Sequence, residues 1–287
     1  MSNKFVFITD DSCDLPRDFL AEKGIVLMEL SFIIDSVQYK PTDITPKAFY
    51  DLLRQGKKSA TAQVSMEQAK EFMVPYLEQG QDVFYLAFSS GLSGTCNSGM
   101  MAAKELAQEY PDRKIIVVDS LAASMGQGLM VYKLQQMMEA GATVEEMASW
   151  TEKNRDNIVH MVTVDDLMHL HRGGRISRGS AIVGSMLGIK PIIHLDDVGT
   201  LQVIDKIRGR KQSLIDVVDK AIKCVGDVAN DIFMVSHGDC EEDALFVADL
   251  ITQKLGIKEK MINFVGPVIG SHTGPGVIAL FLMAEHK

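Results

Sequence analysis

A short apolar run followed by a loop of small residues constrains the fold of this chain more than any other stretch. Residues 83–88 have the length and composition of a buried strand. They continue into residues 89–99, which are mostly serine, glycine and threonine, and then into residues 100–110, which are rich in helix-forming side chains. A strand, a tight loop and a helix in this order are typical of a parallel α/β sheet.

The same alternation predicts an α/β fold for the whole chain. Strands are predicted at residues 5–8, 25–34, 83–88 and 114–118, which gives an N-terminal α/β domain over residues 1–156 with a mostly parallel sheet. A second α/β domain is expected over residues 157–287. Its predicted strands are residues 159–164, 189–195, 200–206, 232–235, 261–265 and 277–284, and its predicted helices are residues 165–171, 179–187, 212–224 and 241–255. The closing loop and strand, residues 266–287, are expected to return to a site between the two domains.

Polar residues mark the predicted helix starts. The predicted N-caps are Thr45, Ser65 with Gln68, Thr143, Asp239 and either Ser12 or Asp14. Pro46 suits the first helical position, whereas Pro75 is expected to kink or shorten its helix. The helix that follows residues 114–120 is predicted to begin at Leu121 and to run to Glu139.

The charge of the chain is unevenly distributed. The formal net charge is −9, which argues against general affinity for nucleic acid. Residues 172–211 nevertheless contain eight basic and three acidic residues, a local charge of +5 that leaves −14 for the remainder. One basic stretch on an acidic chain favours a specific anionic partner or ligand.

The cysteines and the chain start indicate a reduced, cytoplasmic protein. The four cysteines lie far apart with no Cys-x-x-Cys, so neither a zinc site nor a disulfide framework is predicted. The first residues lead directly into a strand without a signal-peptide core, and no apolar run reaches the roughly 20 residues of a membrane span. Asp10, Asp11 and Asp14 are compatible with a metal site, but they are also typical of a strand-to-helix turn, and we expect no metal.

Three predicted loops share the carboxyl edge of the N-terminal sheet, where ligands of α/β proteins bind. They are residues 10–12, 89–97 and 119–120. In the second loop, Ser93, Thr95 and Asn97 can donate to an anion beside a helix start. The absence of lysine and arginine from that loop favours a carboxylate over a phosphate. An ordinary turn with serine and threonine caps is the structural alternative.

Two further side chains have no evident structural duty. Thr61 and Gln63 lie in a predicted loop just before the Ser65 cap. A serine hydrolase that uses Ser93 as nucleophile and His272 as base is an alternative function, although no Gly-x-Ser-x-Gly surrounds Ser93. A phosphate- or nucleotide-sensing module is a third, although neither a P-loop nor a Gly-x-Gly-x-x-Gly after the first strand is present.

Seven short motifs are spread over nearly the whole chain. They are TDDS at residues 9–12, DLP at 14–16, TAQVS at 61–65, SSGLSGT at 89–95, GGRI at 173–176, IKPI at 189–192 and GPVIGSHTGPG at 266–276. In this order and combination, they resemble the DegV family, the fatty-acid-binding proteins that serve bacterial fatty acid kinase. Val64 stands where the family often has proline and Cys96 where it often has tyrosine, and both residues border the expected head-group site.

The resemblance implies a two-domain α/β protein of the DegV-like fold that binds one long-chain fatty acid and is not itself a catalyst. The carboxylate would be bound by Thr61, Ser93 and His272, with Thr95 beside them. Secondary ligand positions would be Gln63, Asn97, Ser120, Gly94 and Gly270, and a basic surface at Arg172, Arg175, Arg208 and Arg210 would dock the ATP-binding kinase subunit. No cofactor and no nucleic acid are expected, and transient contact with a membrane surface is a further expectation.

Overall fold

A parallel sheet forms the N-terminal half of the molecule. The computed structural model describes residues 5–177 and 188–286. The sheet has the order β2-β1-β6-β7 with all neighbours parallel, which confirms the predicted parallel sheet, although only residues 25–28 of the strand predicted at residues 25–34 belong to it. Its strands are β1 (Phe5–Asp10), β2 (Ile25–Met28), β6 (Asp82–Ala87) and β7 (Ile115–Asp119).

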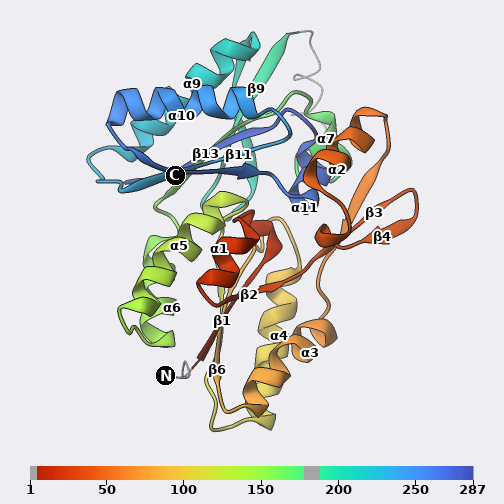
Figure 1. The fold of residues 1–287 in the computed structure, drawn as a ribbon, viewed down its shortest axis with the longest axis vertical. Coiled ribbons are helices and arrows are strands. Elements are labelled where there is room, and N and C mark those ends of the chain that lie inside the picture. Colours follow the sequence, from red (N-terminus) through yellow and green to blue (C-terminus); the bar gives the residue numbers. More distant parts are fainter. Residues whose placement is uncertain (1–4, 178–187, 287) are drawn as a thin grey trace.

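Helices cover both faces of this sheet. On one face, Val6 and Ile8 of β1 pack with α3 (Met66–Glu78) and α4 (Thr95–Glu109). On the other face, Phe7 packs with α1 (Arg17–Glu22), α5 (Met125–Glu139) and α6 (Val144–Asn154). Alternate side chains of one strand point to opposite faces, so β1 is buried on both sides. Figure 1 shows α3 and α4 on the opposite side of the sheet from α5 and α6.

A mixed sheet forms the C-terminal half, in the order β10-β9-β8-β13-β11-β12. Its strands are β8 (Ile158–Thr163), β9 (Ile189–Leu195), β10 (Leu201–Arg208), β11 (Ile232–His237), β12 (Glu259–Phe264) and β13 (Ile278–Met283). β9 and β10 pair antiparallel, which confirms the predicted hairpin. α9 (Arg210–Val225) and α10 (Glu241–Leu255) cover one face, and α5 packs against the other. α5 is thus shared between the two sheets.

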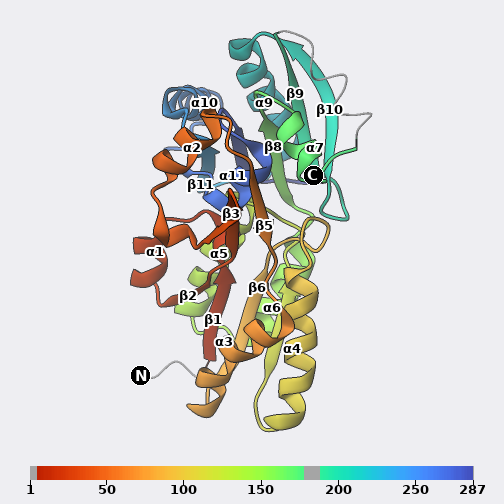
Figure 2. The same ribbon diagram turned by 90° about the vertical axis from the view of Figure 1, so that its right-hand side faces the viewer.

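A third, small sheet extends from the N-terminal half toward the C-terminal half. It contains β3 (Ser31–Ile34), β4 (Val37–Tyr39) and β5 (Ser59–Ala62) in the order β4-β3-β5, with α2 (Pro46–Arg54) beside it. A short 3-10 turn, Pro41–Asp43, lies between β4 and α2, and another, Asp11–Cys13, follows β1. α2 lies close to α11 (Pro267–Thr273), and α11 in turn lies beside α7 (Met168–Arg172), as Figures 1 and 2 show. The extension therefore brings β5 to the C-terminal half.

Three of the predicted helix caps are confirmed. Thr45 accepts a hydrogen bond from the backbone N–H of Ala48 at 3.3 Å, and Pro46 occupies the first helical position. The reciprocal capping box of Ser65 and Gln68 is present at the start of α3. Thr143 caps α6 in the same manner. Local polar chemistry at a helix start can be predicted from sequence because both partners lie within one turn.

Other predicted helix ends are wrong. α5 begins at Met125 rather than at Leu121, because Leu121 and Ser124 have φ angles of +46° and +52° that interrupt a helix. α3 continues through Pro75 to Glu78, so the helix is not shortened at Pro75, whereas a kink there stays a prediction. Neither Ser12 nor Asp14 caps α1, since both are buried and are bound elsewhere.

Asp239 does not cap α10 either. It has a left-handed φ of +56° and pairs with Arg54 of α2. The predicted final loop, residues 266–276, contains the short helix α11, so His272 is on a helix. The predicted helix at residues 179–187 lies outside the described residues. Within the described part of the chain, no helix is long and apolar enough to cross a membrane.

The predicted domain boundary falls in the turn between α6 and β8. One apolar core cluster nevertheless joins Phe7 and Leu129 of the N-terminal half to Val162 and Phe281 of the C-terminal half. The division into residues 1–156 and 157–287 therefore stays a prediction. α11 packs on the N-terminal extension, where the Tyr50 hydroxyl donates to the carbonyl oxygen of Val265 at 2.7 Å.

Candidate functional site

A largely apolar cavity of about 450 Å³ lies among the elements that join the two halves. A cavity of this size is within the range for small-molecule sites, which are mostly apolar with a few polar groups. Its apolar wall draws on several distant segments, including Leu30, Phe88, Leu170, Ile193, Val265 and Phe281. Its polar lining residues are Thr61, Gln63, Ser93, Ser124, His160, Arg175, His272 and Thr273.

The three predicted carboxylate ligands all line this cavity. The Thr61 hydroxyl oxygen lies 2.8 Å from Nε2 of His272, so β5 and α11 are joined at the cavity wall. Ser93 contributes its hydroxyl from the loop after β6. Thr61 lies on strand β5, not in a loop as predicted. From this strand, the Thr61 hydroxyl reaches Nε2 of His272.

His272 is a neutral imidazole in this environment. Burial, followed by the positive charge of Arg175, lowers the pKa of His272 to about 4. Its Nδ1 atom is buried and has no hydrogen-bond partner within the described part of the chain. A methyl group built at Gly173 would lie under 3.0 Å from that nitrogen. Because Gly173 has no side chain, the imidazole ring of His272 can occupy the space beside it.

Ser93 and Thr95 form one short polar unit. The Ser93 hydroxyl donates to Oγ1 of Thr95 at 3.0 Å and accepts from the Thr95 backbone N–H at 3.2 Å. Oγ1 of Thr95 also accepts from the backbone N–H of Val64 at 3.3 Å. Thr95 is buried and is not among the cavity-lining residues, so it orients Ser93 instead of facing the cavity.

The predicted secondary positions divide into two groups. Gln63 lines the cavity, and its side chain occupies the space where a Cβ at Gly94 would lie. A Cβ at Gly270 would collide with the Tyr50 side chain, and neither Gly94 nor Gly270 is among the cavity-lining residues. The structure does not bring Asn97 and Ser120 to this cavity.

Their own contacts explain this separation. Asn97 is exposed on α4. The buried Ser120 hydroxyl accepts from the backbone N–H of Ala122 at 3.1 Å and so forms a local turn. Both residues lie in the predicted loops, but neither is among the cavity-lining residues.

Arg175, predicted to be part of a docking surface, instead lines the cavity. It is partly buried, its Nε donates to the carbonyl oxygen of Leu92 at 2.9 Å, and its Nη1 donates to the carbonyl oxygen of Gly173. Burial lowers the pKa of Arg175, and no carboxylate among the described residues forms an ion pair with it. The sequence analysis missed this cavity-lining cation because the family resemblance and the local charge count together assigned Arg175 to a docking surface.

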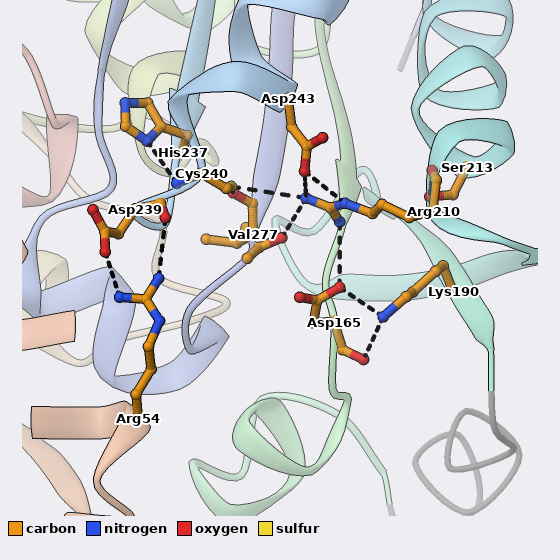
Figure 3. A network of polar contacts seen from close by, with 11 residues as sticks. Arg54, Asp165, Lys190, Arg210, Ser213, His237, Asp239, Cys240, Asp243 and Val277 are labelled. Atoms are coloured by element: carbon orange, nitrogen blue, oxygen red, sulfur yellow. Dashed lines mark hydrogen bonds and ion pairs between the residues drawn. The ribbon is translucent and has the colours of Figure 1, made fainter. Parts of the chain in front are cut away.

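Arg210 also differs from a free surface charge. Its guanidinium binds Asp243 at 2.8 Å and the carbonyl oxygen of Gly276 at 2.8 Å, and it lies 3.6 Å from Asp165 (Figure 3). Lys190 completes the network through Asp165 at 2.6 Å. By contrast, Arg172 and Arg208 are exposed. A docking role for the four arginines stays a prediction, although much of the charge of Arg210 is compensated internally.

The predicted acidic turn is a buried hydrogen-bond centre. Asp10 accepts from the Tyr85 hydroxyl at 2.8 Å and from the backbone N–H of Phe88 at 2.9 Å. Asp14 accepts from the Ser124 hydroxyl at 2.5 Å and from the backbone N–H of Gly266 at 2.8 Å. Among the described residues, no group of three or more His, Cys, Asp or Glu side chains is arranged to hold a metal ion.

Other polar lining residues were missed by the sequence analysis. Ser124, bound to Asp14, and His160, which accepts from the backbone N–H of Ala123 at 3.3 Å, come from segments with no recognisable motif. Thr273 also faces the cavity, and its adjacency to His272 is the signal that could have identified it. The others could not be found without the fold.

The contacts do not form the nucleophile–base–acid chain that the hydrolase alternative requires. Ser93 is bound to Thr95, and Nε2 of His272 is bound to Thr61. No carboxylate within the described residues orients the other ring nitrogen. A histidine with a pKa of about 4 is also a weak general base near neutral pH.

Comparisons with known proteins agree with this architecture. A family model described as "Uncharacterised protein, DegV family" matches residues 4–285. A DegV domain-containing protein of Clostridium perfringens is 42% identical over 287 residues, which cover 99% of each chain.

Two solved structures are similar over nearly their whole length. One, described as fatty acid binding of a DegV family protein from Thermus thermophilus, is 28% identical with a TM-score of 0.86 and covers 98% of this chain and 99% of that one. The other, a DegV lipid binding protein from Thermotoga maritima, is 26% identical with a TM-score of 0.86 and covers 99% of both. With a family model that spans almost all residues and relatives that match end to end, this chain belongs to the DegV family.

Proposed function

We propose that this protein binds one long-chain fatty acid in the cavity, with the carboxylate at Thr61, Ser93 and His272. The observation that carries the proposal is the division of one cavity into an extensive apolar wall and a small group of hydrogen-bond donors. The relatives from Thermus thermophilus and Thermotoga maritima, described as fatty acid binding and lipid binding, support it. Arg175 supplies a positive charge beside the same donors.

The tail dominates affinity and the head group sets orientation. Burial of a C16 tail at ~0.8 kcal/mol per methylene gives a gross gain on the order of 10 kcal/mol. One hydrogen bond to the charged carboxylate contributes about 1.5–3 kcal/mol. A single hydroxyl can therefore be lost without release of the lipid.

The protein serves as a lipid-presenting subunit and not as a catalyst, and it uses no cofactor. A separate ATP-dependent fatty acid kinase performs the chemistry. A carboxylate oxygen of the bound lipid attacks the terminal phosphorus of ATP, the bond from that phosphorus to ADP breaks, and ADP leaves with the bonding electron pair. The product is an acyl phosphate.

The first experiment is mass spectrometry of the small molecules released when natively purified protein is denatured. We expect a stoichiometric C14–C18 fatty acid. A protein that holds no lipid and takes up no added fatty acid would overturn the proposal. Rapid labelling of Ser93 by a fluorophosphonate, lost in His272→Ala, would then favour the hydrolase, whereas stabilisation by nucleotides would favour the nucleotide-sensing module.

Ser93→Ala tests the division of roles. We expect acyl-phosphate formation with the kinase to fall far more than fatty-acid retention. Ser90→Ala is the matched control, because Ser90 is an exposed serine of the same loop that does not line the cavity. Equal losses of lipid and of turnover in Ser93→Ala would refute the division.

A further inference from the structure

A separate cavity of about 440 Å³ lies beside the turn that follows β1. The starts of α1, α2 and α11 and the end of β12 also contribute to its wall. Val268 is the one described residue that lines both this cavity and the apolar cavity. None of the three predicted carboxylate ligands lines it, so it is distinct from the fatty-acid site.

Acidic side chains dominate the charge of this cavity. Asp11, Asp14 and Asp18 line it, and Arg17 is the one basic side chain among the described residues that do so. Arg17 binds Glu29, which lies outside the lining, at 3.0 Å, whereas its distance to Oδ2 of Asp11 is 3.8 Å. Glu29 therefore compensates most of the charge of Arg17, and the acidic cavity keeps an excess of negative charge.

One carboxylate oxygen of the acidic cavity lacks a hydrogen-bond donor. The Asp11 side chain is 5% exposed, and its Oδ1 accepts from the backbone N–H of Leu30 at 3.1 Å. Its Oδ2 is buried and has no hydrogen-bond partner within residues 5–177 and 188–286. Burial raises the pKa of Asp11 well above its usual value, and neither the Leu30 N–H nor Arg17 offsets this rise. Because Asp11 lines the cavity, a cationic ligand there can supply the missing donor and the missing charge.

The other two aspartates occupy different settings. Both carboxylate oxygens of Asp14 already accept, one from the Ser124 hydroxyl and one from the backbone N–H of Gly266. Asp18 is exposed in the first turn of α1, at the rim of the cavity. Apolar side chains form much of the remaining wall, including Leu15, Pro16, Leu27, Pro41, Phe264 and Pro267. A buried acid, an apolar wall and an exposed acid suit a ligand with two cationic ends joined by an apolar chain.

We propose that the acidic cavity binds a small aliphatic diamine in its diammonium form. One ammonium group donates to Oδ2 of Asp11, the methylene chain lies against the apolar wall, and the second ammonium group lies at Asp18. An ammonium group has three donors and a positive charge, which are what the buried Asp11 oxygen lacks. A metal ion is the weaker candidate, because no group of three or more His, Cys, Asp or Glu side chains in the described part of the chain is arranged to hold one.

The test is isothermal titration calorimetry of the natively purified protein with 1,4-diaminobutane, n-butylamine and 1,4-butanediol. Diaminobutane should bind most tightly, butylamine about tenfold more weakly because it lacks the second charge, and the uncharged diol more weakly still. Asp11→Asn preserves the shape of the side chain but removes its charge, and it should weaken diaminobutane binding at least about tenfold. Asp18→Asn should reduce the affinity for diaminobutane to that for butylamine.

Asp249→Asn is the matched control, because Asp249 is an exposed aspartate on α10 that does not line the acidic cavity. It should leave diaminobutane affinity unchanged, and all three variants should bind palmitate as the unaltered protein does. No binding of diaminobutane by the unaltered protein, unchanged affinity in Asp11→Asn, or equal affinity for diaminobutane and the diol would overturn this inference. Each of these results would leave the fatty-acid proposal standing, since palmitate binding is measured separately.

Discussion

Replacement of Gly173 by alanine is the sharpest test of the head-group site. Gly173 ends α7 with φ −73° and ψ −5°, a conformation that alanine adopts without strain. The added methyl group would lie under 3.0 Å from Nδ1 of His272 and 3.1 Å from two ring carbons. Thr61 binds the other ring nitrogen at 2.8 Å. The imidazole is therefore confined between two neighbours, and the substitution acts on its position alone.

The size of the effect follows from this geometry. The added carbon would lie 2.1 Å from Nδ1 of His272, whereas ordinary contact requires about 3.5 Å, so the ring has to move by about 1.4 Å or rotate away from Thr61. Either movement removes one hydrogen bond to a bound carboxylate, which is worth about 1.5–3 kcal/mol. We expect palmitate affinity to fall by about 10- to 150-fold in Gly173→Ala.

The assay is displacement of a fluorescent fatty acid by palmitate and by 1-hexadecanol, which has no carboxylate. Palmitate affinity should fall while hexadecanol affinity is retained. Gly174→Ala is the control, because Gly174 has a φ of +71° and open space around its Cβ, so it tests backbone strain without contact to His272. Unchanged palmitate affinity in Gly173→Ala, or equal loss of both ligands, would refute the reasoning.

Two further predictions follow from buried charge. Burial raises the pKa of Asp14 from 3.8 to about 7. The contribution of the protonated Asp14 carboxyl to the stability of the native state is therefore fully present below about pH 4, and it is lost as the pH rises through about 7. Asp14→Asn should therefore gain on the order of 3 kcal/mol relative to the native chain between pH 5 and pH 8, measured as urea midpoints, and a gap that is independent of pH would contradict this. Arg210→Glu should lose about 2 kcal/mol or more, since it places a third acid beside Asp243 and Asp165, whereas the exposed Arg208→Glu should stay within about 0.5 kcal/mol. Equal melting temperatures of the two arginine variants would contradict that difference.

The fold could be predicted wherever the signal is local. The strands of the parallel sheet are short apolar runs, and the caps at Thr45, Ser65 and Thr143 lie within one turn of their partners. Prediction failed where distant contacts decide the backbone. Aspartate is a typical helix-capping residue, but the Asp239 carboxylate binds Arg54, which is 185 residues away in the sequence, and does not cap α10. α11 was predicted as a loop because its glycines and proline are typical of turns.

The candidate site shows the same limit of prediction, because its contacts join residues that are far apart in the sequence. Residue type and family resemblance predict Thr61, Ser93 and His272 as carboxylate ligands, and the structure brings Thr61 and His272 together because α11 packs against β5. The Thr61–His272 bond spans 211 residues, so no local pattern encodes it. It is supported by contacts equally remote in sequence, such as that of Tyr50 with Val265.

Arg175 shows that a count of charges in the sequence does not determine whether a cation lies at the surface or at a cavity. A count of basic residues predicts a surface, whereas burial decides whether a cation faces solvent or a ligand. Arg175 donates to two backbone carbonyl groups and contributes to the lowered pKa of His272, so its charge acts inside the site. Arg172, three residues earlier, is exposed and does not line the apolar cavity. Of two arginines in one basic stretch, the fold therefore places one at the cavity wall and the other at the surface.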